Sequence, residues 1–149
     1  MRALLQRVSR ASVRVDGESV AEIGRGLVIL LGVGHDDGES VGEALARRVA
    51  ELRIFEDDEG RTNRSILDVG GAAIVVSQFT LYADTSRGRR PGFTNAAAPD
   101  VADRVYRRFA EALRAAGVVD VQSGRFGAEM AVELVNEGPF TIWLDTALR

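Results

Sequence analysis

Apolar residues in the first third of the chain follow the patterns of β-strands. Residues 11–15 alternate apolar and polar side chains with the two-residue period of a half-buried strand. The pair Asp16-Gly17 then indicates a hairpin turn, because glycine adopts the positive φ that tight hairpin turns require. Residues 20–23 return as a second strand. Residues 27–31 form a continuous apolar run bounded by glycines, which is typical of a strand buried on both faces.

Two segments instead have the three- and four-residue spacing of amphipathic helices. The first covers residues 40–55, and Ser40 with Glu43 has the spacing of a capping box. The second covers residues 99–116; it opens on a proline, which suits a first helical turn, and Gly117 is its expected stop. Each helix has one apolar stripe, so we expect both to pack on a sheet.

Further strand-like segments complete the chain, at residues 72–81, 118–122, 128–135 and 140–144. Neither linker, repeat nor low-complexity tract interrupts the pattern. Successive strands joined by short turns favour antiparallel pairing, although the pattern leaves the strand order open. We expect an α/β (α+β) fold in a single domain over residues 1–149. In it, two main helices pack on a mainly antiparallel sheet or partly closed barrel.

Length and composition limit the classes of protein to which this chain can belong. A length of 149 residues is near the usual size of one domain. The absence of cysteine excludes disulfides, thiolate metal sites and a cysteine nucleophile. Charges at Arg2, Arg7 and Arg10 interrupt the early apolar residues, so no signal peptide is expected. No stretch approaches the roughly 20 apolar residues of a membrane helix. We expect a cytoplasmic protein that does not associate with membranes.

The net charge of −3 does not indicate a nucleic-acid-binding protein. A polyanion would have to meet a local basic patch, and the compact candidate is Arg87, Arg89 and Arg90. Charge alone leaves two interpretations open, a phosphate contact and a solvated arginine-rich loop.

The usual catalytic groups are scarce. His35 is the sole histidine, it lies in a polar loop, and no Gly-X-Ser-X-Gly sequence accompanies it. We therefore interpret His35 as a surface residue rather than as part of a catalytic triad. One histidine without cysteine also argues against a zinc site. Neither a dinucleotide-binding nor a Walker-type glycine pattern occurs, so we expect no cofactor and no metal.

Polar residues follow a very apolar strand at Ser77-Gln78-Phe79-Thr80. One interpretation is a strand that simply runs out into solvent. The other is functional, because a strand end offers the exposed N–H groups and hydroxyls from which an oxyanion hole is built. Thr80 is a second-ranked candidate nucleophile, since no base that would activate it is evident.

The segment at residues 136–141 contains Gly138-Pro139 between two strand-like runs. The simpler interpretation is a turn. An X-Pro bond is also where a cis peptide is least unfavourable. A rigid corner with no Cβ on its glycine would be suited to testing the stereochemistry of a ligand with backbone atoms.

Six segments together resemble the bacterial and eukaryotic type of D-aminoacyl-tRNA deacylase (D-tyrosyl-tRNA deacylase) over essentially the whole chain. They are residues 5–13 (LQRVSRASV), 54–57 (IFED), 76–84 (VSQFTLYAD), 88–91 (GRRP), 124–128 (GRFGA) with Met130, and 136–141 (NEGPFT). Asn95, where the family has aspartate, and Gly92, where serine is common, depart from the pattern. Both lie outside the two central motifs.

The resemblance implies a proofreading hydrolase that releases D-amino acids from D-aminoacyl-tRNA, and also acts on glycyl-tRNA. It implies a homodimer in which a cis Gly138-Pro139 motif enters the partner's site and excludes L-amino acids. It further implies that the tRNA 2′-OH assists the reaction. The resemblance implies that the floor of the catalytic pocket is formed by Ser77, Gln78, Phe79 and Thr80. It implies that the Gly-Pro motif is supported by Arg7, Asn136 and Thr141. It also implies that the terminal adenosine and the tRNA are contacted by Met130, Arg87, Arg89 and Arg90.

Two alternatives stay open. One is a relative with a trans Gly-Pro bond that clears L-alanine from the wrong tRNA; Arg7 argues against it, because that relative looks to lack the arginine. The other is a non-catalytic nucleic-acid-binding module. The absence of a large basic surface argues against it.

Overall fold

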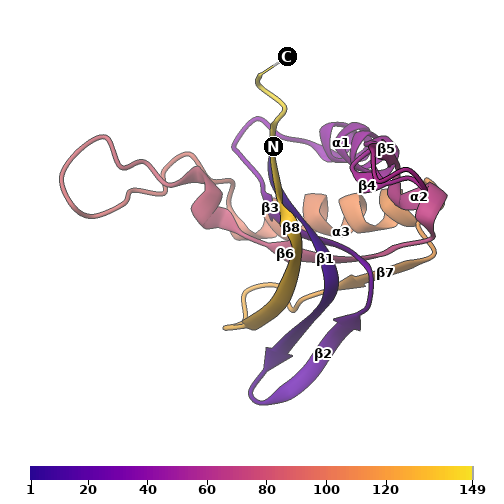
Figure 1. Cartoon of the computed structure of the whole chain (residues 1–149). Coiled ribbons are helices and arrows are strands. Elements are labelled where there is room, and N and C mark those ends of the chain that lie inside the picture. Colours follow the sequence, from indigo (N-terminus) through magenta and orange to yellow (C-terminus); the bar gives the residue numbers. More distant parts are fainter. Residues whose placement is uncertain (149) are drawn as a thin grey trace.

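The computed structural model describes residues 1–148 and is built around one mixed sheet (Figure 1). Its strands are β1 (Arg2–Val15), β2 (Glu18–Ile23), β3 (Gly26–Gly32), β6 (Ala72–Ser77), β7 (Asp120–Ser123) and β8 (Ala131–Asp145). The order is β2-β1-β3-β6-β7, and β8 pairs with β1. The β1–β2 turn is formed as expected, with positive φ at Asp16 and Gly17.

Two long helices lie together on one side of the sheet, α1 (Glu39–Glu51) and α3 (Pro99–Ala115) (Figure 1). The shorter elements are β4 (Phe55–Glu56), β5 (Thr62–Arg64), α2 (Ile66–Val69) and the 3₁₀ helix η1 (Phe79–Tyr82). Apolar residues from α1, α3 and the inner face of the sheet share one core, in which Phe55 and Phe109 are fully buried. Within residues 1–148, no helix is both long and apolar enough to span a membrane.

Both directions of strand pairing occur. The pairings of β1 with β2, β3 and β8 are antiparallel, as expected. The pairings of β3 with β6 and of β6 with β7 are parallel, which short turns did not predict. In each parallel case the connection contains a long helix, α1 or α3, and parallel neighbours require such a crossover.

The expected partly closed barrel is confirmed by a contact between the two ends of the sheet. The side chain of Gln122, on β7, pairs with the backbone of Glu22, on β2. The Glu22 N–H donates to Gln122 Oε1 and Gln122 Nε2 donates to the Glu22 carbonyl, each at 2.8 Å. This amide replaces the missing backbone ladder between the two strands, so the barrel is nearly closed.

The expectation for the first helix was wrong at both ends. Helix α1 ends at Glu51, four residues before Phe55, and its N-cap is Gly38, with no capping bond from a side chain. The predicted capping box at Ser40 and Glu43 is therefore not formed. A capping box is found instead at Ser65 and Asp68, where it begins the short helix α2. The second helix begins at Pro99 and ends before Gly117, as expected.

Three of the expected strands also differ from the prediction. Strand β6 ends at Ser77, and the following residues form η1 rather than more strand. The segments before and after Gly138-Pro139 belong to one long strand, β8, and both pair with β1. The motif is thus not a turn between two strands. It lies where the register of the β1–β8 pairing shifts, between the Gln6–Thr141 and Val8–Asn136 pairs.

Candidate active site

A cavity of about 710 Å³ lies where β6 ends. One wall is Val76 to Phe79, and the other runs from Phe126 to Val132. Phe93 and residues 96–99 close a third side. The cavity therefore contains four of the predicted site residues, Ser77, Gln78, Phe79 and Met130.

Local structure explains why polar groups reach this cavity. Val75 and Val76 are buried in β6, and the chain then leaves the sheet into η1. This change turns the Phe79 ring outward, 55% exposed, with its edge against the Phe93 ring at 5.0 Å between centroids. Thr80 is exposed beside the cavity rather than in its lining, and Gln78 Nε2 donates a hydrogen bond to Thr80 Oγ1.

The 3₁₀ helix is held from its far end. The Tyr82 hydroxyl donates to Asp37 at 3.1 Å, and Arg2 Nη1 donates to the Leu81 carbonyl at 2.8 Å. Partial burial, together with the charge of Asp37, raises the pKa of Tyr82 well above its ordinary value. The hydroxyl therefore stays a donor at any physiological pH, and η1 is fixed beside the cavity.

The Gly138-Pro139 motif is exposed and does not line the cavity of its own chain. Its peptide bond is cis. A Cβ on Gly138 would lie 2.1 Å from the Phe140 nitrogen, so only glycine fits. Asn136 closes the base of the motif: its Nδ2 donates to the Arg7 and Phe140 carbonyls at 2.9 and 3.0 Å, and its Oδ1 accepts from the Phe140 N–H at 3.1 Å.

Arg7 supports the motif from the interior, where its residue is only 6% exposed. Its Nε donates to the Glu137 carbonyl at 3.0 Å and its Nη1 donates to the Ile54 carbonyl at 2.8 Å. The guanidinium also lies 4.3 Å from the centre of the Phe140 ring. These contacts are made within one chain. Thr141 only accepts a 3.3 Å bond from Gln6 on the exposed face.

The arginine-rich loop projects from the body as an extended arm between η1 and α3 (Figure 1). Asp84 and Gly92 pair at the base of this arm through backbone bonds of 2.7 and 2.9 Å. Arg87, Arg89 and Arg90 are exposed beyond that pair and do not line the cavity. The position of His35 is exposed, as predicted, and its Nε2 donates to the carbonyl of Thr94, which follows the arm.

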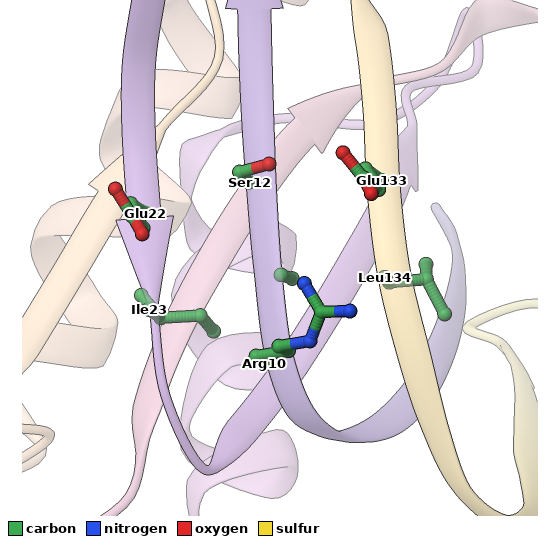
Figure 2. A pocket seen from close by; sticks show the side chains of 7 residues that line it. Arg10, Ser12, Glu22, Ile23, Glu133 and Leu134 are labelled. Carbon is green, nitrogen blue, oxygen red and sulfur yellow. The ribbon is translucent and has the colours of Figure 1, made fainter.

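Figure 2 shows a second, much smaller hollow on the surface of β1, β2 and β8. Arg10, Ser12, Glu22 and Glu133 give it a polar lining. Its volume of about 50 Å³ is too small for an aminoacyl group. Of these two, the cavity beside β6 is therefore the better candidate for the active site.

The sequence did not single out several residues of the cavity. Phe93 and residues 96–98 lie between two predicted elements and have no periodicity that marks them. Phe126 stands in one of the family-like segments, which was the available signal. Phe93 and its neighbours reach the end of β6 because they lie at the start of the crossover that contains α3.

The chain is similar to known proteins over nearly its whole length. Residues 4–145 match the family model described as D-Tyr-tRNA(Tyr) deacylase. The chain is 60% identical to a D-aminoacyl-tRNA deacylase of Thermomicrobium roseum over 147 residues, which is 99% of this chain and 95% of the relative. It is 57% identical to one of Paracoccus denitrificans, with 100% and 99% covered.

Two solved structures share the fold. A c-Myc DNA unwinding element binding protein is 39% identical, with a TM-score of 0.92 over 98% of this chain and 99% of the other. A probable eukaryotic D-amino acid tRNA deacylase is 22% identical, with a TM-score of 0.84 over 96% and 97%. The second likeness is one of fold alone.

Fold, cavity and relatives together define an enzyme of the hydrolase class that acts on carboxylic ester bonds. The chain belongs to the D-Tyr-tRNA(Tyr) deacylase family.

Proposed function

We propose that the protein removes D-amino acids, and glycine, from tRNA in the cytoplasm by hydrolysing the ester at the 3′ end. The observation that carries this proposal is the full-length match to the family, joined to a cavity that Ser77, Gln78 and Phe79 line where β6 ends. Ester hydrolysis needs only modest stabilisation of a tetrahedral oxyanion. Backbone N–H groups where β6 turns into η1 are suited to that task.

The chemistry then proceeds with help from the substrate. Water attacks the ester carbonyl carbon, and the carbonyl oxygen becomes an oxyanion that N–H groups near Phe79 and Thr80 stabilise. The C–O bond to the ribose 3′ oxygen breaks as the oxyanion collapses. The neighbouring 2′-OH relays the proton of the attacking water to that leaving oxygen. The products are the free amino acid and tRNA, and no side chain has to change its charge.

Chiral selection is assigned to Gly138-Pro139 of a second copy of the chain. The motif is exposed, and Asn136 and Arg7 hold it in place. Among residues 1–148, β8 pairs only with β1, so its second edge is available for association. Val132, Val135 and Trp143 on the same strand are 38–45% exposed and add apolar surface. These features support a homodimer in which one copy's motif enters the other's cavity.

The tRNA end is assigned to the wall opposite the strand end. Met130 and Phe126 supply an apolar surface of the right kind for the terminal adenosine. Arg87, Arg89 and Arg90, on the projecting arm, are placed to meet phosphates of the acceptor end. The acidic total charge of −3 limits such contacts to a few.

Purified protein should hydrolyse D-tyrosyl-tRNA and glycyl-tRNA and spare L-tyrosyl-tRNA by at least about 100-fold. A rigid backbone obstacle discriminates by exclusion, which is stronger than the loss of one apolar contact. The measurement is the release of labelled amino acid from each of the three tRNAs at equal enzyme concentration. Rapid release of L-tyrosine would refute the assignment.

Replacement of Thr80 by alanine should leave the rate on D-tyrosyl-tRNA within about tenfold of the parent, a loss of at most about 1.4 kcal/mol of transition-state stabilisation. Thr80 lies outside the cavity lining, and its hydroxyl accepts a bond from Gln78 rather than facing a base. Single-turnover kinetics provide the measurement. Complete loss of activity with the fold intact would restore Thr80 as a covalent nucleophile.

Two other functions are distinguished by the same preparation. Removal of L-alanine from a non-cognate tRNA would appear as release from L-alanyl-tRNA without release from D-tyrosyl-tRNA. Duplex DNA binding, suggested by the name of the 39% identical solved structure, would appear as tight, salt-sensitive association without hydrolysis. Hydrolysis confined to D-aminoacyl and glycyl esters excludes the first as the main activity.

A further inference from the structure

Tyr106 has a buried hydroxyl that the reaction described above does not use. The residue lies in α3, 4% exposed, with its hydroxyl directed at the sheet rather than at solvent. The hydroxyl donates to the Val75 carbonyl at 2.9 Å, and the Gly124 carbonyl is 3.4 Å away. One phenol therefore contacts the backbone of two segments that are far apart in the sequence.

Those two segments are the starts of the two walls of the cavity. Val75 precedes Val76 and Ser77 on β6, where the first wall begins, and Gly124 precedes Phe126 on the second. The Val75 carbonyl also accepts from the Gly124 N–H, at 3.0 Å. The walls thus meet at one carbonyl, and the Tyr106 hydroxyl is bonded to it.

The second wall is packed tightly against the same point. The Tyr106 ring lies 6.0 Å from the Phe126 ring, centre to centre. Met130 sits over Gly124 so closely that a Cβ there would be 2.6 Å from the Met130 sulfur. Gly124 thus contacts Met130, and Tyr106 contacts Phe126, at the start of the same wall. Burial raises the pKa of Tyr106, so the hydroxyl remains protonated and able to donate.

We propose that Tyr106 is a positioning residue, which fixes the spacing between the strand end that holds the reacting ester and the Phe126–Met130 wall that holds the terminal adenosine. This inference rests on the proposed function of the cavity. It adds that the two halves of the substrate are aligned by a hydroxyl that touches neither of them. Loss of the hydroxyl should therefore weaken binding of the terminal adenosine more than it slows the hydrolysis step.

The test uses full-length Tyr106→Phe, which removes one oxygen atom and keeps the ring. The KM for D-tyrosyl-tRNA should rise about fivefold, the equivalent of about 1 kcal/mol for one hydrogen bond, while kcat stays within about twofold. Inhibition by adenosine 5′-monophosphate, as a probe of the nucleotide half, should weaken by the same factor. A KM change without a kcat change is the signature of lost positioning of the nucleotide.

The matched control is Arg114→Gln, on the same helix. Arg114 Nη2 donates to the Val121 carbonyl at 2.8 Å, so the variant also loses a bond from α3 to β7. Arg114 does not line the active-site cavity. Both variants should lower the urea midpoint, but only Tyr106→Phe should change KM. Equal kinetic behaviour of the two would make Tyr106 a structural residue and overturn the inference.

A second variant covers the case in which Tyr106→Phe does not fold. Gly124→Ala keeps the Tyr106 side chain but crowds the Met130 side of the same wall, at the residue whose carbonyl lies 3.4 Å from the phenol, and it should raise KM in the same way. An unchanged KM in the variants that fold contradicts the inference alone. A parent enzyme that releases no D-tyrosine contradicts the proposed function instead, so the two failures are distinct.

Discussion

A Gly138→Ala enzyme should lose at least about 100-fold in its rate on D-tyrosyl-tRNA, and its fold should survive. The alanine Cβ would lie 2.1 Å from the Phe140 nitrogen and 2.9 Å from the Phe140 Cβ, so the backbone of the motif must move. That movement also disturbs the bonds between Asn136 and Phe140. A displacement of about 1 Å in a group that positions a substrate reduces rates by about 100-fold.

The exposed position of Gly138 makes the loss specific to the reaction. We expect a loss of about 1–2 kcal/mol in the free energy of unfolding, because the hydrogen bonds between Asn136 and Phe140 weaken but no fully buried side chain is displaced. Gly24→Ala is the matched control, since a Cβ at Gly24 has no neighbour within 4 Å. Release of labelled D-tyrosine and urea unfolding of both variants provide the measurements. Equal activity of the two variants would show that the Gly138-Pro139 motif takes no part in the active site.

The sequence predicted the strands best where turn chemistry and side-chain alternation agree. The β1–β2 hairpin is the clearest case, because only a tight turn explains Asp16-Gly17 between two alternating runs. The parallel pairings of β6 could not be predicted in this way. Their partners are set by how α1 and α3 pack, and that depends on contacts between residues far apart in the chain.

Local signals were less reliable at the ends of elements. Ser40 and Glu43 have the spacing of a capping box, as do Ser65 and Asp68, yet only the second pair forms one. Spacing alone cannot distinguish the two pairs, because the conformation of the preceding loop decides which residue occupies the N-cap position. Helix α1 begins one residue before Ser40, which removes that residue from the N-cap position.

Some residues of the candidate site could be predicted from the sequence, and others could not. The sequence singled out Ser77, Gln78 and Phe79, which line the cavity, because polar residues that end an apolar strand are visible in the sequence; Thr80, singled out with them, lies beside the lining. Phe93 and residues 96–98 were not singled out, since only the crossover to α3 brings them to β6. The buried contacts of Arg7 with Ile54 and Glu137 were likewise invisible, because 47 and 130 residues separate the partners.

Those contacts make Arg7→Met the substitution with the largest expected effect on stability. Methionine fills much of the same volume but leaves the Glu137 and Ile54 carbonyls without their donor, and it removes the cation from the Phe140 ring. A buried acceptor left without a partner costs about 1–3 kcal/mol. We expect a loss of about 2–4 kcal/mol in the free energy of unfolding, with activity reduced at least about tenfold because the Glu137–Gly138 backbone is released.

Arg10→Met is the control, because Arg10 lies on the same strand but is exposed. Urea unfolding should give Arg7→Met a lower midpoint with an unchanged slope, which identifies a loss of stability rather than a more compact unfolded state. Arg7→Lys should fall between the parent and Arg7→Met, since one ammonium cannot reach both carbonyls as the planar guanidinium does. If Arg7→Met unfolded at the same midpoint as Arg10→Met, the buried guanidinium would not be what holds the motif. The stiffness of Gly138-Pro139 would then have to come from Asn136 alone.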